Sequence, residues 1–264
     1  MDSDYKVDIL KMYFDLDMNI TEDIKIHQPT IQEIIDYGET EFWNTAYLLT
    51  ANPTSMRLAL WDSGVDWNKI NDFDLFINLV KDLPVELTSI FFGDLDFSKF
   101  FIIKKDEVEE DKSPYVMVYS PNSKIQIDEN LYIEIVQHLR VMLDIHPKKQ
   151  KAKNKITKEL IIEEERDKNR IATLNAKKSP IKKSLLFSFI SSALNHPGFK
   201  YKKNELRDVG ILEFMDSIKR IHVYEEVTSL MTGMYMGMVD LKGRDLNKDL
   251  NWSRDLYESI ENKK

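Results

Sequence analysis

The sequence contains no cysteine among its 264 residues. Disulfide bonds, thiolate nucleophiles and thiolate-bound metal sites are therefore excluded, and an intracellular protein is the simplest interpretation. The N-terminal stretch is acidic and its apolar residues are interrupted, so it lacks the basic start and continuous apolar core of a secretory signal. No segment approaches the roughly 20 apolar residues that span a bilayer. These absences predict a soluble chain without a membrane partner.

Glycine is also scarce, with eight residues, and none stands in a phosphate-binding or nucleophile-elbow motif. The histidines are scattered and do not form an HExxH pair; they are His27, His138, His146, His196 and His222. Carboxylates are abundant, but no pair lies in a recognisable apolar, glycine-flanked setting that would tune a pKa for catalysis. The sequence thus predicts no catalytic residues, no metal site and no cofactor, and we expect a protein that is not an enzyme.

Charge is unevenly distributed along the chain. The net charge is -8, yet residues 148–183 carry 13 Lys and Arg against 5 Asp and Glu, so the remainder of the chain is strongly acidic. Few large apolar residues interrupt this basic segment, which favours a solvated helix or flexible connector. Nucleic-acid binding is the alternative function for it, but the interleaved aromatic residues of a single-strand binding platform are missing. Nucleic acid is therefore not the expected partner.

Helix signals dominate the N-terminal half. Thr30 and Glu33 have the spacing of a capping box, and Gly38 weakens the middle of the helix that they open. Asp72 is the expected N-cap of a second helix, and Asp128 precedes apolar residues at helical spacing. Gly64 is positioned to end a short intervening helix. Pro84 is suited to the first turn of another.

Three short segments between these helices are rich in β-branched and aromatic residues: KFFIIKK, YVMVYS and KIQID. They predict a small antiparallel β meander at about residues 99–128, with a hairpin loop at 120–123. The expected fold class is therefore predominantly α-helical (α+β). We expect a helical region with the meander at 1–147, the basic connector at 148–183 and a helical C-terminal region at 184–264.

In the C-terminal region, Ser179 and Pro180 are predicted to open one helix and Asp208 a longer one. The longer helix leads into the stretch LMTGMYMGMVDLKGRDLNKDLNW, in which methionine and glycine alternate closely before charge returns. The pattern favours a core helix whose glycines permit close packing. An adaptable partner-binding surface is the alternative, because methionine is flexible and polarizable. The candidate partner-binding residues are Met231, Met234, Met236, Met238 and Trp252.

The stretches IHQPTIQEIIDYGETEFW, LLTANPTSMRLALWDSGVDWNKINDFDLF and GMYMGMVDLKGRDLNKDLNWSRDLY resemble tail-assembly chaperones of tailed phages that infect Gram-positive bacteria. The resemblance is one of pattern and layout, over about residues 26–80 and 180–257. It implies a helical assembly factor of the host cytoplasm that binds the tape-measure protein, or another phage tail protein, and keeps it soluble. Several copies along one partner would gain from avidity, and a homo-oligomer is also compatible.

The β meander and the basic connector depart from this family pattern. They leave open a structural subunit of the virion, in the tail or neck, as an alternative function. A nucleic-acid-binding regulator acting through residues 148–183 is the second alternative.

Overall fold

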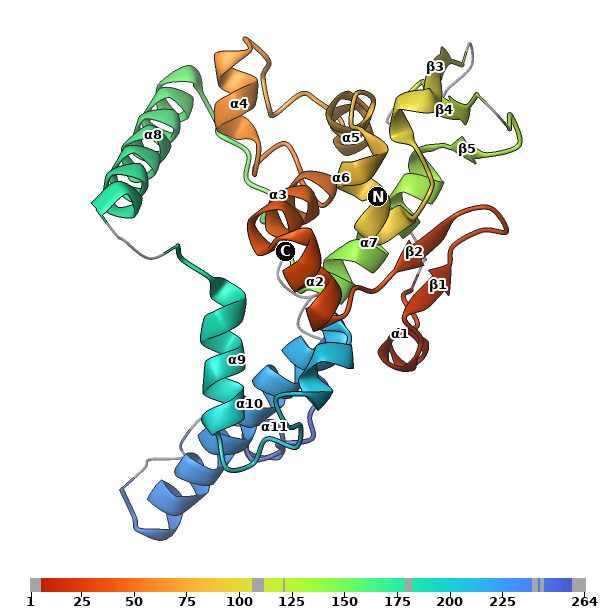
Figure 1. Ribbon diagram of the computed structural model, residues 1–264. Helices are drawn as coiled ribbons and strands as arrows, with labels where there is room; N and C mark the ends of the chain where they lie inside the picture. The colour runs from red at the N-terminus through yellow and green to blue at the C-terminus, as the bar shows by residue number, and fades with distance from the viewer. Residues whose placement is uncertain are drawn as a thin grey trace.

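The computed structural model describes residues 6–105, 112–120, 122–178, 182–238, 242 and 245–257. In this part of the chain the fold is mostly helical, with 11 α-helices and two small antiparallel sheets, which confirms the predicted fold class. Most helices gather in one body, from which α8 stands off on one side and α10 extends downward (Figure 1).

The first elements of the described residues are a helix and a hairpin that the sequence pattern did not predict. These elements are α1 (Ile9–Phe14), β1 (Asp17–Asn19) and β2 (Lys25–His27). They are short, but Met12, Met18 and Ile26 are buried in the main core. Their stability therefore comes from tertiary packing rather than from their own length.

The predicted capping box is confirmed: the Thr30 hydroxyl accepts the Glu33 backbone N–H, and the Glu33 carboxylate accepts the Thr30 N–H at 2.8 Å. The helix that follows is not a single element. It divides at Gly38, whose φ of 101° lies where a residue with a Cβ would be strained. The two parts are α2 (Ile31–Tyr37) and α3 (Glu39–Leu49).

Three further helices and a 3-10 turn follow: α4 (Arg57–Asp62), α5 (Asp72–Val80), α6 (Val85–Phe92) and η1 (Phe97–Lys99). Pro84 is the N-cap of α6, one residue before the first turn in which it was predicted. Gly64 follows α4, as predicted, although the α4 C-cap itself is Ser63. The prediction of Asp72 as an N-cap was wrong by one residue. Asn71 takes that position, and its side chain accepts the Phe73 N–H.

The predicted meander is present as β3 (Phe100–Lys104), β4 (Tyr115–Tyr119) and β5 (Gln126–Ile127), paired antiparallel in that order. Pro121, in the expected hairpin loop, lies outside the described residues. Asp128 then caps α7 (Glu129–Leu143), as its sequence position predicts. Helix α7 buries Tyr132, Ile135 and Leu139 among others, and it packs on α3, α10 and β5.

The basic connector contains one long helix, α8 (Lys155–Lys178), in which Ile162 alone is buried among the described side chains. Of the two interpretations of the basic segment, the structure therefore agrees with a solvated helix and not with a flexible connector. It packs beside α4, whose Leu58, Leu60 and Trp61 lie against a small cluster that is separate from the main core. The buried members of this cluster are Trp67, Ala152 and Ile162.

The C-terminal elements are α9 (Leu185–Asn195), η2 (Glu205–Asp208), α10 (Ile211–Tyr235) and α11 (Leu246–Asp249). Ser179 and Pro180 lie outside the described residues, and α9 begins later than predicted, with Ser184 as its N-cap. Asp208 was also a wrong prediction: it belongs to η2, and Gly210 precedes α10.

The start of α10 is part of the same core as the N-terminal helices. Ile211, Leu212 and Phe214 belong to the same buried core cluster as Phe42 and Ile34. A β-bridge between Thr30 and Gly210 joins the two regions through their backbones. The base of α10 is thereby fixed to the body, while its other end extends beyond it.

Candidate functional site

Helix α10 has two halves of different character. In the first half Ile211, Leu212, Phe214 and Ile218 are buried, whereas from Lys219 to its end only Val227 is. The second half therefore has no cover from the main core. Figure 1 shows it extending from the body, toward the bottom of the view.

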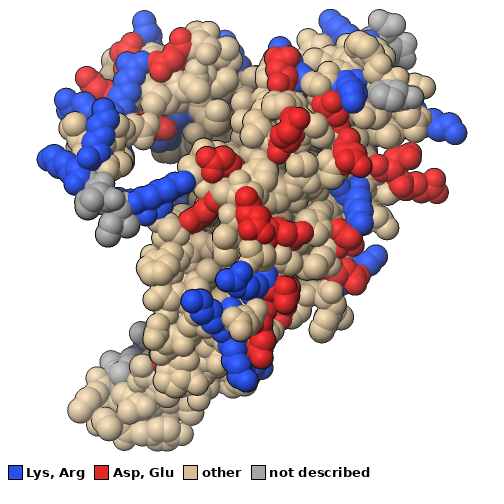
Figure 2. Space-filling model, in the orientation of Figure 1, with Lys and Arg blue, Asp and Glu red and all other residues tan. Residues whose placement is uncertain are grey.

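The end of this helix bears no charge over twelve consecutive residues, from Val227 to Met238. Tyr235, Met236 and Met238 are 77%, 64% and 79% exposed. The surface at the lower end of the molecule in Figure 2 is accordingly almost free of Lys, Arg, Asp and Glu. We call residues 227–238 the α10 tip. An exposed projection without charge is typical of a surface that contacts another molecule.

The α10 tip contains four of the five predicted partner-binding residues. Met231 and Met234 are three positions apart, on one face of the helix, and both are partly exposed. Met236 and Met238 follow at its end and are open to solvent. The core interpretation of these methionines, which the pattern favoured, is therefore wrong for Met236 and Met238.

A glycine determines where the helix ends. Gly237 has a φ of 68°, and its N–H donates to the carbonyl of Met234 at 3.0 Å. The Met238 N–H reaches back to the carbonyl of Gly233 at 2.9 Å. These two bonds form a Schellman motif, which satisfies carbonyls at the helix end. Gly237 is therefore a helix stop rather than a helix-packing residue. A glycine near the end of an apolar helical run is a signal that could have predicted this.

Trp252, the fifth predicted residue, does not lie with the methionines. Its ring meets that of Tyr224 edge to face, with the centroids 6.1 Å apart. Tyr224 precedes Met236 by three turns, which is about 18 Å along the helix axis. Trp252 is 54% exposed, so it presents a second apolar point beside α10 rather than an extension of the tip.

The C-terminal tail that carries Trp252 folds back along α10. The Arg220 guanidinium donates to the carbonyl of Arg254 at 2.7 Å, and Arg254 forms an ion pair with Glu226 at 3.0 Å. The Tyr257 hydroxyl donates to the Asp216 carboxylate at 3.2 Å. Burial and the Asp216 carboxylate both raise the pKa of Tyr257, which favours the neutral phenol that donates this bond. These long-range contacts could not have been predicted from the local pattern.

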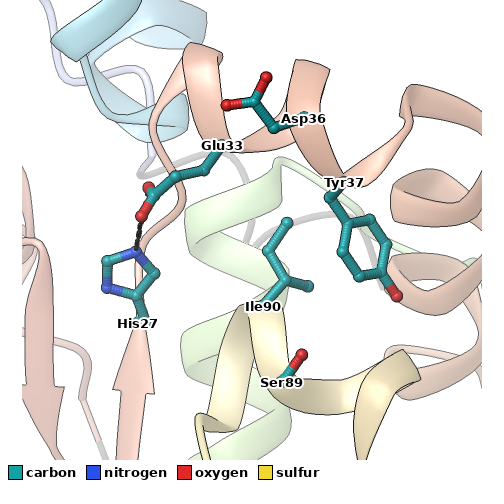
Figure 3. A pocket seen from close by; sticks show the side chains of 6 residues that line it. All are labelled: His27, Glu33, Asp36, Tyr37, Ser89 and Ile90. Atoms are coloured by element: carbon teal, nitrogen blue, oxygen red, sulfur yellow. Dashed lines mark hydrogen bonds and ion pairs between the residues drawn. The ribbon is translucent and has the colours of Figure 1, made fainter.

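The molecule also has an open depression between β2, α2 and α6. Figure 3 shows the residues that line it, which are His27, Glu33, Asp36, Tyr37, Ser89 and Ile90. His27 lies between two carboxylates, with Nδ1 2.8 Å from Asp17 and Nε2 3.1 Å from Glu33. A histidine between two acids is an arrangement that can serve acid–base chemistry, so its other contacts decide its role.

Those contacts are structural. The Glu33 carboxylate is part of the capping box of α2, and burial, which raises its pKa, is outweighed by hydrogen bonds from Thr30 and His27 that lower it. Asp36 accepts the side-chain amide of Gln32 at 2.8 Å, and the Ser89 hydroxyl donates to the carbonyl of Glu86 within its own helix. The polar groups of the depression thus connect the β1–β2 hairpin to α2 and complete local helix contacts.

Within the described residues, no cluster of three or more His, Asp or Glu side chains is arranged to hold a metal ion. The described helices likewise include none that is long and apolar enough to cross a membrane. No family model matches the sequence, and no match was found among curated proteins or among solved structures.

Proposed function

We propose that this protein is a non-enzymatic phage tail-assembly chaperone that binds the tape-measure protein and keeps it soluble during tail assembly. One structural observation carries the proposal: the α10 tip exposes methionine and tyrosine side chains over a stretch without charge. The resemblance of residues 26–80 and 180–257 to that chaperone family supplies the partner. The site of action is accordingly the host cytoplasm.

The chemistry of the tip suits such a partner. A long tape-measure helix would expose apolar faces that aggregate unless they are covered. Methionine has three rotatable bonds and a polarizable sulfur, so Met236 and Met238 adapt to apolar side chains of different shapes. The absence of charge removes the cost of desolvating ions when an apolar helix docks. Recognition of this kind is broad rather than sequence-specific, as coating a long chain requires.

The direct test is co-expression with a tape-measure protein from the same genome. We expect the soluble yield of that protein to rise several-fold when the wild-type chain is present. The paired substitution Met236→Glu with Met238→Glu introduces two charges at the contact surface and should abolish the gain. The matched control is Leu10→Glu, which alters a side chain that is 71% exposed on α1 and should preserve the gain.

Two outcomes would contradict the proposal. One is an unchanged soluble yield with the wild-type chain, and the other is an equal effect of the tip and control variants. Mass spectrometry of purified virions tests the structural-subunit alternative separately. A chaperone should be absent or substoichiometric there, whereas a subunit would be present in fixed copy number.

A further inference from the structure

Helix α8 carries a second exposed apolar surface, distant in sequence from the α10 tip. Four large apolar side chains on it are more than half exposed: Ile156 at 69%, Leu160 at 62%, Ile171 at 54% and Leu174 at 52%. With about 100° of rotation per residue, all four fall within about 60° of arc. They form one face of the helix, which we call the outer face of α8.

The opposite face attaches the helix to the body. Ile162 is packed beside Trp67, and the Lys158 ammonium contacts the Asp66 carboxylate at 2.6 Å and 2.7 Å. Arg57 also forms an ion pair with Glu165. These contacts fix the orientation of α8, so the outer face is held away from the body. Figure 1 shows α8 standing at the margin of the molecule, beside α4.

The order of residues along the outer face is nearly symmetric about position 165. Apolar pairs occupy both ends, and Glu163 and Asp167 lie between them at equal distances from the centre. When two such helices are placed antiparallel, Ile156 of one copy lies opposite Leu174 of the other, and Leu160 lies opposite Ile171. A second copy of this chain therefore provides an apolar contact at each end of the face.

The flanking charges favour the same arrangement. An antiparallel pair places Glu159 of one copy opposite Arg170 of the other, and each Glu164 near both Lys168 side chains. Within one chain, Lys168 already contacts Glu164 at 2.6 Å. A parallel pair would instead place Glu159 of one copy beside Glu164 of the other. It would also place the two Glu163 side chains beside each other. The repulsion between these like charges disfavours the parallel pair.

We propose that two copies of this protein associate through the outer faces of α8, with the helices antiparallel. Glu163 and Asp167 of opposite copies face each other at the centre of this interface. Their like charges weaken the pair, so the dimer is reversible and sensitive to neutralisation of these carboxylates. The inference is independent of the proposed function, because neither the α10 tip nor its partner enters the argument.

Because the chain has no cysteine, introduced cysteines provide a direct test of the orientation. Ile156→Cys and Leu174→Cys are prepared as separate proteins and oxidised alone or mixed, and products are resolved on a non-reducing gel. In an antiparallel pair, two residues at position 156 are about 27 Å apart, far beyond the roughly 7 Å limit for a disulfide. We therefore expect a disulfide-linked dimer in the mixture and not in either protein alone.

The matched control is Asn169→Cys, an exposed position on the opposite side of α8. Mixed with either cysteine variant, it should form no dimer above the level of random collision. Dimers of Ile156→Cys alone would indicate parallel helices and overturn the proposed arrangement. An absence of linked dimer in the mixture would overturn the interface itself.

Sedimentation velocity over a range of concentrations tests the strength of the pair. Leu160→Glu should render the chain monomeric at concentrations where the wild type dimerises, while Asn169→Glu should leave dimerisation unchanged. Neutralising the centre with Glu163→Gln and Asp167→Asn should lower the dimer dissociation constant by about tenfold. Circular dichroism confirms that each variant remains helical. A wild-type chain that is monomeric throughout would refute the proposal.

Discussion

The side chain of Gln28 accepts the backbone N–H of Leu212 at 2.9 Å, linking residues 184 positions apart. Its amide nitrogen donates to the carbonyl of Met12 at 2.8 Å, and the side chain is only 2% exposed. One buried amide therefore joins α1, the segment before α2 and the first turn of α10. This contact fixes the base of the helix whose other end is the proposed binding surface.

Substituting Gln28→Ala should lower the free energy of unfolding by about 2–3 kcal/mol, because it leaves a buried N–H and a buried carbonyl without partners. Chemical denaturation measures the change. Gln126→Ala, which shortens an exposed glutamine on β5, is the matched control and should alter stability by less than about 0.5 kcal/mol. Equal effects of the two substitutions would show that the buried amide has no special role.

Gly210 should be sensitive to substitution, because its backbone lies close to the side chain of Gln28. A Cβ at position 210 would lie 2.5 Å from Oε1 of Gln28 and 3.1 Å from a methyl group of Leu16. Gly210→Ala is therefore expected to be destabilising in the wild-type chain, yet to cost less when Gln28→Ala is also present. A double-mutant cycle measures this coupling. Strict additivity of the two changes would contradict the close approach.

Helix α8 should be able to detach from the body without unfolding of the main core. Ile162 is the one buried side chain that α8 contributes among the described residues, and it packs in a cluster apart from the main core. Ile162→Ala should therefore increase hydrogen exchange throughout α8 while leaving exchange in α7 nearly unchanged. Asn169→Ala is the control, because that side chain lies on the same helix and is exposed. Equal loss of protection in α7 would show that the two regions unfold together.

Local signals predicted much of this fold. The capping box of Thr30 and Glu33, the Asp128 cap and the meander all depend on residues within a few positions of each other. The sequence signal for the division at Gly38 was weaker. A glycine within an apolar stripe indicates a weak point in the helix, but it does not show whether the helix ends there. Sequence pattern fails where the deciding contact is remote, as with Gln28 and Leu212 or the docking of Tyr257 on α10.

The methionines illustrate the same limit at the candidate site. The α10 tip has no charged residue on any face, so its sequence does not distinguish a buried helix from an exposed one. Burial depends on whether another part of the chain covers it, and the described tail instead packs beside Tyr224, three turns earlier. The residue identities were thus available from the sequence, but their exposure was not.

Acid should weaken the contact between α7 and α10. Asp144 accepts from the Lys219 ammonium at 2.7 Å and lies 3.2 Å from His146 Nε2. Burial raises the pKa of this carboxyl, but the hydrogen bonds from His146 and Lys219 outweigh it and hold the pKa below the ordinary 3.8. Since the folded-state pKa is depressed, the carboxylate stabilises the fold above the ordinary value. That stabilisation is lost as the pH falls through the folded-state pKa.

Asp144→Asn tests this contribution, because asparagine tolerates the left-handed conformation that Asp144 adopts at a φ of 55°. At pH 7 the variant should be less stable by about 1–2 kcal/mol, reflecting loss of a charge-assisted contact. The difference from wild type should shrink as the pH is lowered below about 4. Thermal unfolding of both proteins, measured from pH 3 to pH 7, gives this difference in stability. A difference that does not vary with pH would show that the charge of Asp144 is not responsible.

The C-terminal tail should detach from α10 when Arg220 is removed. The Arg220 guanidinium donates to the carbonyls of Arg254, at 2.7 Å, and Trp252, at 3.5 Å, so it holds the tail through its backbone. Arg220→Ala leaves the tail attached mainly through Tyr257 and the ion pair of Arg254 with Glu226. Loss of hydrogen bonds to a charged donor costs about 1.5–3 kcal/mol, which corresponds to roughly a tenfold or greater increase in the detached population.

Limited chymotrypsin digestion measures that population, because a detached tail exposes the backbone after Trp252 to cleavage. The fragment ending at Trp252 should appear about tenfold faster in Arg220→Ala than in the wild type, whereas Lys200→Ala, a change at an exposed cation before η2, should have no effect. At protease concentrations low enough that cleavage is slower than reclosing, the cleavage rate reports the equilibrium between open and closed states. Equal cleavage rates in all three proteins would mean that the bonds from Arg220 do not hold the tail against α10.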